Sequence, residues 1–455
     1  MTDVAALLRD ALGERVDTSA AALDAARADK SGHRAAGRPL AVVHAASVSD
    51  VQTTMRIASE TGTPVVTRGA GTGLAGGANT GEGEIALSVR DMNRVLEVRP
   101  DDLLAVVEPG ILNADLGRAL APYGVWWAPD PASREISTVG GNIATGAGGL
   151  LCAKYGVVRD AVLALDVVLA DGRLISTGHR SVKGVTGYDL TALMIGSEGT
   201  LGVVVGATLK LRRLVPGETR TLTSQFPDVR TAAAGAAAVT ASGAQPAIME
   251  LMDAVSLAAA HALLGLPAPT PGATQLTVQT DGVAAAAEQA AIAAVLTSAG
   301  GAVRLAADDA EAAQLWAVRR AMHPAMESLG TALIEDVSVP RSALPAMFDE
   351  IARIEAQYDL TIPTVCHAGD GNLHPNFVFN GDEVPERVWQ AADALFRAAI
   401  ALGGTLTGEH GIGVLKSRWL ADELGADQWT LQRGIKTVFD PAGILNPGKV
   451  FAAQP

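Results

Sequence analysis

Cysteine is scarce in this sequence, with Cys152 and Cys366 the only two among 455 residues. Small secreted scaffolds are held together by more disulfides, so a reducing compartment, the cytoplasm, is the simpler prediction. Basic residues are also in the minority, because 35 lysines and arginines face 49 acidic residues and leave a formal net charge of −14. Proteins that bind nucleic acid are usually basic, so this class is disfavoured.

Long apolar runs are missing as well. No stretch offers about 20 strongly apolar residues without charge, as a membrane-spanning helix would need. Residues 1–17 carry acids and arginines on an amphipathic pattern, which predicts a helix rather than a signal peptide. The alanine-rich residues 232–247 are too weakly hydrophobic to cross a bilayer. We therefore expect no transmembrane segment; peripheral membrane association through a partner stays open.

Glycine, in contrast, is abundant, with 49 residues in a composition that is 48% hydrophobic and 18% charged. This is a globular composition, and 455 residues exceed the size at which one core stops growing, so we expect two or more domains. Three glycine-rich stretches, 62–83, 129–156 and 187–211, are separated by predicted strands. Because glycine allows a ligand to approach the backbone, their repetition suggests one long ligand contacted at several places.

A strand–helix–strand unit precedes the first glycine-rich loop. Residues 40–46 read as a strand, and the sequence SVSDVQTTMRIASETG reads as a helix that ends at Gly62. Ser49 and Gln52 fit a capping box at its start. The segment PVVT then reads as the second strand, and a hairpin with Asp171-Gly172 as its turn is expected further along.

The loop itself contains Gly71, Gly73 and Gly76 in G-x-G-x-x-G spacing, with Asp91 twenty residues after Gly71. An NAD-binding Rossmann fold requires a long helix directly after such a loop, and here only turn residues and another strand follow. NAD is therefore disfavoured. The amides of a glycine loop between strands can instead cradle a phosphate; a mobile surface turn is the structural alternative.

Two histidines stand in the segment TVCHAGDGNLHPNFVF. If Asp370-Gly371 forms a two-residue hairpin loop, His367 and His374 face each other directly across the strands, with Cβ atoms roughly 5 Å apart. Two imidazoles at this distance can bind one metal ion. Buried or turn histidines bonded to backbone are the structural alternative, and the hairpin alone leaves the two open.

Several of these motifs together resemble one family. RGAGTGLAGGAN, PDPASREISTVGGN, GYDL with GSEGTLG, CHAGDGNLHPN, GEHGIG and FDPAGILNPGKV are similar, in order and spacing, to the vanillyl-alcohol-oxidase (PCMH-type) FAD flavoproteins, and especially to D-2-hydroxyacid dehydrogenases of the glycolate oxidase and D-lactate dehydrogenase type. The likeness runs from about residue 37 to the C-terminus. It implies an α+β fold: an FAD-binding domain of two α+β subdomains over 1–214, an α+β cap with an antiparallel sheet over 215–405, and a helical segment, 406–455, that returns to the flavin.

The resemblance also implies which residues hold FAD. The first loop would wrap the pyrophosphate, a second group would line the flavin channel, Val203 would contribute backbone contacts, and Asn446 would lie near the isoalloxazine. Thr72 stands where covalent members often have histidine, so FAD is expected to be non-covalent. The implied cofactor residues are Arg68, Gly69, Ala70, Gly71, Thr72, Gly73, Pro129, Ser137, Thr138, Gly141, Asn142, Ala144, Val203 and Asn446.

Glu409, in the C-terminal segment, would complete a His₂Glu metal site with His367 and His374 of the cap, suited to zinc or manganese. His410 would take the hydroxyl proton of a metal-bound 2-hydroxy acid, while the hydride from Cα of that acid passes to the flavin. The resemblance gives Arg319, on a predicted helix that Pro324 ends or kinks, the role of binding the substrate carboxylate. His323 and Asn376 match further substrate-pocket positions.

One departure narrows the substrate. Members that act on hydroxyglutarate have a lysine shortly before the strand that matches DVSVP, and this chain has Ile334 and Glu335 there. A small monocarboxylate, D-lactate or glycolate, therefore fits better. No iron–sulfur cysteine cluster is present, so electrons would leave to an external acceptor: a quinone, a cytochrome, an electron-transfer flavoprotein or an iron–sulfur subunit. A homodimer stays open.

Three alternatives remain. The histidines would be structural in a metal-independent flavin alcohol oxidase. A non-catalytic FAD subunit of an electron-transfer complex is disfavoured by the joint presence of His367, His374, Glu409, His410 and Arg319. A zinc hydrolase would leave the three glycine-rich loops without a purpose.

Overall fold

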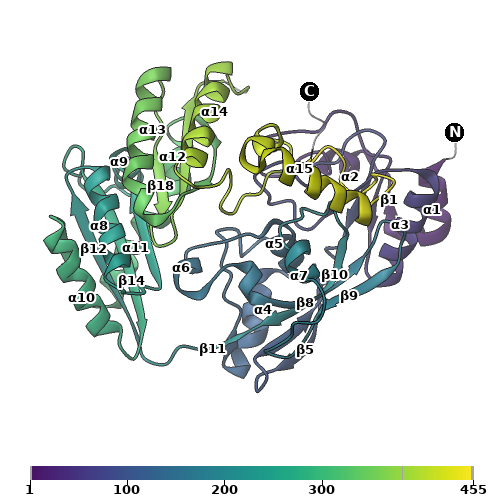
Figure 1. Ribbon diagram of the computed structural model, residues 1–455, viewed down its shortest axis with the longest axis horizontal. Coiled ribbons are helices and arrows are strands. Elements are labelled where there is room, and N and C mark those ends of the chain that lie inside the picture. The colour runs from purple at the N-terminus through teal and green to yellow at the C-terminus, as the bar shows by residue number, and fades with distance from the viewer. Residues whose placement is uncertain (1–2, 382, 452–455) are drawn as a thin grey trace. The chain divides into compact units, whose positions relative to one another are not determined.

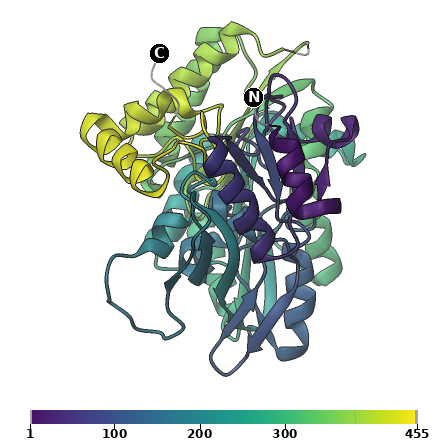
Figure 2. The same cartoon turned by 90° about the vertical axis from the view of Figure 1, so that its right-hand side faces the viewer.

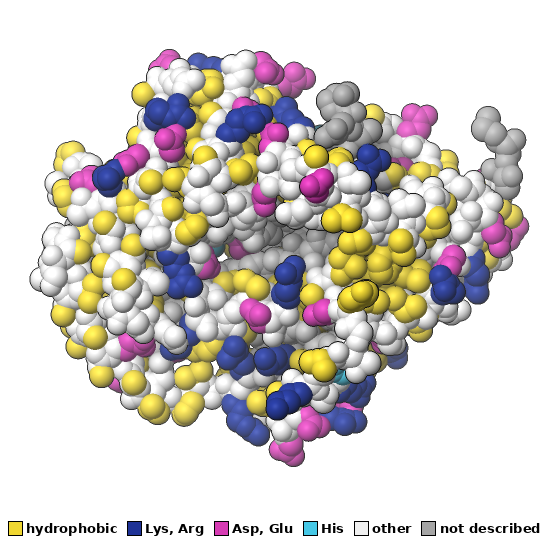
Figure 3. All heavy atoms as spheres, in the orientation of Figure 1, with side chains coloured by type: hydrophobic (Ala, Val, Ile, Leu, Met, Phe, Trp, Pro, Cys, Tyr) yellow, Lys and Arg dark blue, Asp and Glu magenta, His cyan; other side chains and the backbone are white. Residues whose placement is uncertain are grey.

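A computed structural model describes residues 3–381 and 383–451 of the chain. It divides into two compact units. The first unit comprises Met1–Gly149, Gly156–Leu214 and Glu409–Pro455, and the second comprises Leu150–Tyr155 and Val215–Gly408. Among the described residues, no helix is both long and apolar enough to cross a membrane. On the face shown in Figure 3, acidic and basic side chains are interspersed.

The first unit contains two sheets with helices packed on them (Figure 1). The four-stranded sheet has the order β1-β2-β4-β3, in which β2, β4 and β3 are parallel and β1 is antiparallel to β2. The five-stranded sheet is antiparallel, with the order β5-β6-β10-β8-β9. The strands are β1 (Val16–Asp17), β2 (Ala41–His44), β3 (Val65–Arg68), β4 (Ile85–Ser88), β5 (Val95–Arg99), β6 (Leu104–Val107), β8 (Val162–Val168), β9 (Leu174–Gly178) and β10 (Val203–Lys210), and a separate pair joins β7 (Val125–Trp126) to β11 (Arg212–Arg213).

The helices of the first unit include the N-terminal pair α1 and α3, which contact each other and lie toward the viewer in Figure 2. The expected amphipathic N-terminal helix is confirmed, with Leu8 fully buried. Only the short strand β4 stands between Gly71 and Asp91, so the absence of a Rossmann helix is confirmed too. The helices are α1 (Val4–Leu12), α2 (Ala20–Ala25), α3 (Val48–Thr61), α4 (Asn113–Leu120), α5 (Val139–Thr145), α7 (Leu190–Met194) and α15 (Leu420–Phe439).

The second unit is built on one sheet with the order β15-β12-β14-β13-β18-β19-β16, and β17 pairs with β19. Every recorded pairing in it is antiparallel, as the resemblance implied for the cap. Its strands are β12 (Glu218–Phe226), β13 (Ile248–Met252), β14 (Thr274–Gly282), β15 (Ala302–Leu305), β16 (Thr331–Ile334), β17 (Val337–Ser338), β18 (Thr364–His367) and β19 (Asn372–Phe379). Its helices are α6 (Cys152–Tyr155), α8 (Val229–Ala241), α9 (Ala254–Leu263), α10 (Ala285–Ser298), α11 (Asp309–Arg320), α12 (Met322–Glu327), α13 (Leu344–Tyr358) and α14 (Glu386–Ala401).

The start of α3 corrects one prediction. The N-cap is Ser47, whose hydroxyl accepts from the Asp50 amide at 3.2 Å, and not Ser49, which lies inside the helix. The Asp50 carboxylate in turn accepts from the Ala46 amide. The sequence SVSD offers two serines in alternate positions, and the one whose N3 residue is acidic forms the cap. Gly62 ends the helix in a left-handed conformation, as predicted.

Replacing the capping serine tests this assignment. Ser47→Ala leaves an amide at the start of α3 without its side-chain acceptor, so the free energy of unfolding should fall by about 1 kcal/mol. Ser49→Ala, at an exposed position inside the same helix, is the matched control and should change stability far less. Thermal or urea unfolding measures both, and a larger loss in Ser49→Ala would contradict the structure.

Candidate FAD site and candidate metal centre

In the first unit, the glycine-rich motifs converge on the first loop. A Cβ atom placed on Gly69 would clash with the hydroxyl oxygen of Thr138, so these two loops touch through glycine backbone. Thr138 caps α5 by accepting from the Gly141 amide at 3.2 Å. Gly71, with φ +69°, uses the left-handed backbone that glycine permits. Ala70, Thr72 and Gly73 belong to the same loop.

Arg68, implied to wrap the pyrophosphate, has a structural task here. Its guanidinium donates to the carbonyl oxygens of Ala26 and Ala28, at the end of α2, and of Ala78, and so ties the end of the glycine-rich loop to the segment after α2. Burial lowers the pKa of Arg68, while Asp29 acts in the opposite direction. The backbone of the loop, rather than this side chain, is what remains available for a phosphate.

A buried polar network orders the second motif. The Asn142 amide donates to Ser137 at 3.1 Å, and Asn113 donates both to Asn142 and to the carbonyl of Pro129. Ser137, Thr138 and Asn142 are each at most 3% exposed. Among the other implied residues, Ala144 lies in α5 and Val203 begins β10.

Glu198 and Asn446 join the remaining motifs. The Glu198 carboxylate accepts from the amides of Ile412 and Gly413 at 2.6 and 2.8 Å. The Asn446 side chain donates to the carbonyls of Gly77 and Glu198 at 2.9 and 2.7 Å. Burial raises the pKa of Glu198 to about 7, against the opposing effect of those two amides and Lys416.

Buried polar atoms around this loop fit a polar ligand. Among the described residues, five side-chain oxygens lie buried without a hydrogen-bond partner on or beside the glycine-rich loop: Asp29 Oδ2, Thr67 Oγ1, Asn79 Oδ1, Thr80 Oγ1 and Asn446 Oδ1. Native structures rarely leave buried polar atoms unpaired. Unpaired oxygens beside glycine backbone suit FAD, whose pyrophosphate accepts from amides and whose ribityl hydroxyls can donate.

In the second unit, the histidine hairpin forms with a different register from the one predicted. His367 pairs with Asn372, and His374 pairs with Val365, because the loop contains four residues, 368–371, instead of two. The shift moves each pair by two positions and so keeps both histidines on one face. As diagonal neighbours, their ring centroids lie 4.9 Å apart with planes at 82°.

Glu250 lies on the adjacent strand β13, directly opposite His367. One carboxylate oxygen is 2.7 Å from His367 Nδ1, and the other accepts from Nε of Arg319 at 2.8 Å and forms an ion pair with Nη2 of the same guanidinium, also at 2.8 Å. Glu250 is 1% exposed. Burial alone would raise the pKa of Glu250, but His367 and Arg319 hold the pKa below its ordinary value.

Glu409 directly follows Gly408, where the second unit ends. The Gly408 amide and the Thr407 hydroxyl donate to the buried carboxylate of Asp336, which fixes the chain at this point. One carboxylate oxygen of Glu409 and one nitrogen from each of His367 and His374 lie within 4.8 Å of one another. Nitrogen and carboxylate donors grouped in this way suit zinc or manganese.

The other residues predicted to bind or act on the substrate differ in burial and contacts. Asn376 is buried on β19 and donates to the carbonyls of Pro363 and His374. His323 is exposed on α12, 3.6 Å from Glu327, and does not contact Arg319 among the recorded interactions. The helix breaks at Ala321, three residues before Pro324, which lies inside α12. His410 is half-buried in a loop.

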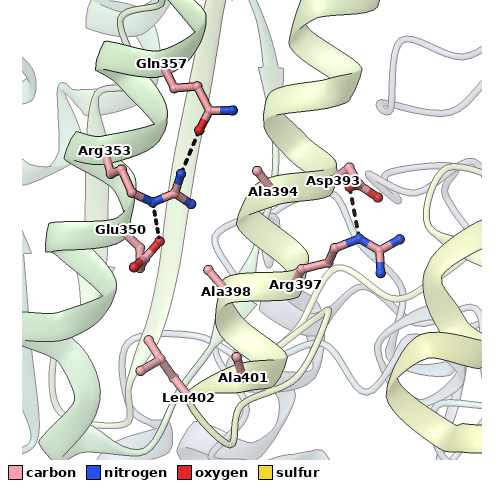
Figure 4. A pocket seen from close by; sticks show the side chains of 9 residues that line it. All are labelled: Glu350, Arg353, Gln357, Asp393, Ala394, Arg397, Ala398, Ala401 and Leu402. Atoms are coloured by element: carbon pink, nitrogen blue, oxygen red, sulfur yellow. Dashed lines mark hydrogen bonds and ion pairs between the residues drawn. The ribbon is translucent and has the colours of Figure 1, made fainter.

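A groove between α13 and α14 in the second unit contains none of these residues (Figure 4). Its alanine floor comes from α14, and the charged side chains along it pair within their own helices, Arg353 with Glu350 and Arg397 with Asp393. This groove has no group that points to chemistry.

Comparisons with known proteins agree with the motifs. The FAD binding domain family matches residues 39–178, and the family of FAD linked oxidases, C-terminal domain, matches residues 215–450. The glycolate oxidase subunit GlcD of Bacillus subtilis is 40% identical over 421 residues, covering 91% of this chain and 89% of that protein. The D-lactate dehydrogenase of Anaerostipes hadrus is 35% identical over 429 residues, covering 91% and 90%.

Solved structures show the same fold. p-Cresol methylhydroxylase matches with a TM-score of 0.78 and 17% identity, covering 99% of this chain and 96% of its own. The 4-ethylphenol oxidase of Gulosibacter chungangensis matches with a TM-score of 0.77 and 18% identity, covering 100% and 97%. The fold is therefore that of the PCMH-type flavoproteins. The chain belongs to the FAD-linked oxidase family and is an FAD-dependent oxidoreductase, which confirms the recognition made from the motifs.

Three buried carboxylates were missed by the sequence reasoning: Glu198, Glu250 and Asp336. Glu250 left a signal, since it interrupts the otherwise apolar strand IMELM, and a charge in such a run has to be paired. Glu198 lies within the glycine-rich motif GSEGTLG, and Asp336 begins the segment DVSVP; neither sequence marks its carboxylate as buried.

The buried Glu198 predicts a stability that depends on pH. Its carboxyl keeps its proton in the folded chain up to about pH 7, whereas in the unfolded chain it ionises near its ordinary value of 4.5. The free energy of unfolding of the FAD-free protein should therefore fall, relative to Glu198→Gln, by roughly 3 kcal/mol as pH rises between these values. Thermal unfolding across this range measures the difference. Glu60→Gln, at an exposed site, is the control, and parallel pH profiles for wild type and Glu198→Gln would contradict the assignment.

Proposed function

We propose that this protein oxidises a small 2-hydroxy acid, D-lactate or glycolate, to the corresponding 2-oxo acid with non-covalent FAD. The observation that supports the proposal most strongly is that one buried carboxylate, Glu250, binds both Arg319 and His367, whose ring contacts that of His374. A 2-hydroxy acid presents a chelating hydroxyl and carboxylate together with a negative charge. The names of the relatives, a glycolate oxidase subunit and a D-lactate dehydrogenase, agree with this substrate class.

The metal ligands proposed are His367, His374 and Glu409. A divalent zinc or manganese ion bound there would lower the pKa of the substrate hydroxyl. The three ligands leave coordination positions open, which a chelating substrate needs. His410, the next residue after Glu409, is proposed to take the hydroxyl proton.

Oxidation removes a hydride and a proton from the substrate. The hydride leaves Cα with the electron pair of the C–H bond, which FAD would accept when bound. The hydroxyl proton goes to His410. The C–O bond thereby becomes a carbonyl. Two electrons then have to leave to an external acceptor, for which a quinone, a cytochrome, an electron-transfer flavoprotein or an iron–sulfur partner is proposed.

Arg319 is proposed to bind the substrate carboxylate. Glu250 accepts from Nε and forms an ion pair with Nη2, so it faces only the Nε–Nη2 edge of the guanidinium, and a second carboxylate would bind along the edge formed by Nη1 and Nη2. Ile334 and the buried Glu335 stand where a lysine would be needed for a second substrate carboxylate, which favours a monocarboxylate over a dicarboxylate.

Anaerobic reduction tests the function. The purified protein should show a flavin spectrum that D-lactate or glycolate bleaches without any acceptor, while L-lactate and D-2-hydroxyglutarate leave it largely oxidised. A flavin that no 2-hydroxy acid bleaches would overturn the proposal and favour the electron-relay subunit or another alcohol substrate. Full bleaching of a protein freed of metal would instead favour the metal-independent oxidase.

The two adjacent arginines give a matched pair of variants. Arg319→Met should lower kcat/KM by an amount equivalent to roughly 2–4 kcal/mol, mainly through KM, because a buried charge partner is lost. Arg320→Met should have little effect, since Arg320 is exposed and donates only to the Ala313 carbonyl among recorded bonds. Steady-state kinetics with D-lactate and glycolate compare them, and a larger effect of Arg320→Met would mean that the wrong arginine was assigned.

A further inference from the structure

Glu250 is a charged residue in the middle of a buried apolar strand. Its neighbours on β13 are Ile248, Met249, Leu251 and Met252, all buried. An ionised carboxylate in such surroundings is costly unless every oxygen is paired. Each oxygen of Glu250 is paired, and its two partners are the proposed metal ligand His367 and the proposed substrate arginine Arg319.

The contact with His367 fixes the proton on the imidazole ring. An ionised carboxylate can only accept, so His367 Nδ1, at 2.7 Å from Glu250, has to donate. The neutral ring then has its lone pair on Nε2, the nitrogen that would bind a metal ion. The direct register of Glu250 with His367 sets this contact through the backbone of two adjacent strands.

The contact with Arg319 comes from the other oxygen of the same carboxylate. Nε donates to it at 2.8 Å, Nη2 forms an ion pair with it at the same distance, and the arginine side chain is 15% exposed. Arg319 stands in the last turn of α11, so its long side chain depends on this partner for its direction. One carboxylate therefore holds both the metal ligand and the arginine.

We propose that Glu250 is a positioning residue that sets the tautomer of His367 and the direction of the Arg319 guanidinium together, and so couples metal binding to recognition of the substrate carboxylate. This assignment rests on the proposed function. Loss of Glu250 is expected to weaken both metal binding and binding of the substrate carboxylate, although Glu250 itself would contact neither the metal nor the substrate.

Glu250→Gln tests the assignment because glutamine keeps the shape but cannot satisfy both partners. With its oxygen toward His367, its amide hydrogens oppose those of Arg319. With its nitrogen toward His367, Nδ1 has to accept and the proton moves to Nε2, where it blocks the metal. Either orientation of the glutamine amide therefore weakens one of the two functions, the positioning of Arg319 or the binding of a metal by His367.

The experiment titrates Zn²⁺ into the metal-stripped, FAD-loaded protein in competition with a chromophoric chelator, and measures KM and kcat separately. Glu250→Gln should raise the dissociation constant for Zn²⁺ about 10- to 100-fold and raise KM more than it lowers kcat. Asp253→Asn is the matched control. Asp253 follows the same strand, and its carboxylate accepts from the backbone amides of Ser256 and Thr364, so this variant should lose stability but keep its Zn²⁺ affinity.

Two results would overturn the assignment. Unchanged Zn²⁺ affinity and KM in folded Glu250→Gln would overturn it alone and leave the proposed function standing. Wild-type protein that binds no Zn²⁺ or Mn²⁺ would overturn the metal-dependent function and this assignment with it. Should Glu250→Gln fail to fold, Glu250→Asp retains the charge but withdraws the carboxylate by one methylene, and the same loss of affinity and rise in KM are expected.

Discussion

The strand pairing of β13, β18 and β19 is the constraint on which the candidate centre depends. Antiparallel pairing sends alternate side chains to one face, so Glu250, His367 and His374 reach the same side without help from a loop. The Glu250 carboxylate then binds His367 and Arg319 at once. Strand backbone positions side chains more rigidly than loops do, and a metal–substrate centre requires that rigidity.

In the first unit, the main structural requirement is to hold irregular backbone in place. Its glycine-rich loops have few hydrogen bonds of their own, so buried side chains tie them together: Arg68 to three carbonyls, Glu198 to two amides, and Asn446 to two further carbonyls. The contacts of Glu198 and Asn446 join segments more than 200 residues apart in sequence. The amides and unpaired oxygens that remain are the groups a dinucleotide can use.

Local rules in the sequence predicted much of this. The missing helix after the glycine loop excluded a Rossmann fold, and Gly62 marked the end of α3 correctly. Two predictions were wrong at places where the local sequence allows two conformations. Ser47 caps α3 instead of Ser49. A four-residue loop replaces the two-residue turn at Asp370-Gly371. The histidines still meet because the register error was two residues, which preserves the face. Glu250 was missed because its partners are 69 and 117 residues away, and no spacing rule connects strand β13 to α11 or β18.

The proposed chemistry depends on a metal ion bound by the imidazoles of His367 and His374 in a flavoprotein. Anomalous X-ray diffraction from crystals of the FAD-bound protein tests this most directly. We predict one anomalous peak per chain, at zinc or manganese absorption edges, bonded to both His367 and His374 at roughly 2.0–2.1 Å, with the Glu409 carboxylate as third ligand. Yellow crystals of a protein that D-lactate or glycolate reduces, with no anomalous density between the two histidines, would contradict it. That result would make the pair a structural contact of the cap sheet and leave the flavin chemistry to proceed without a metal.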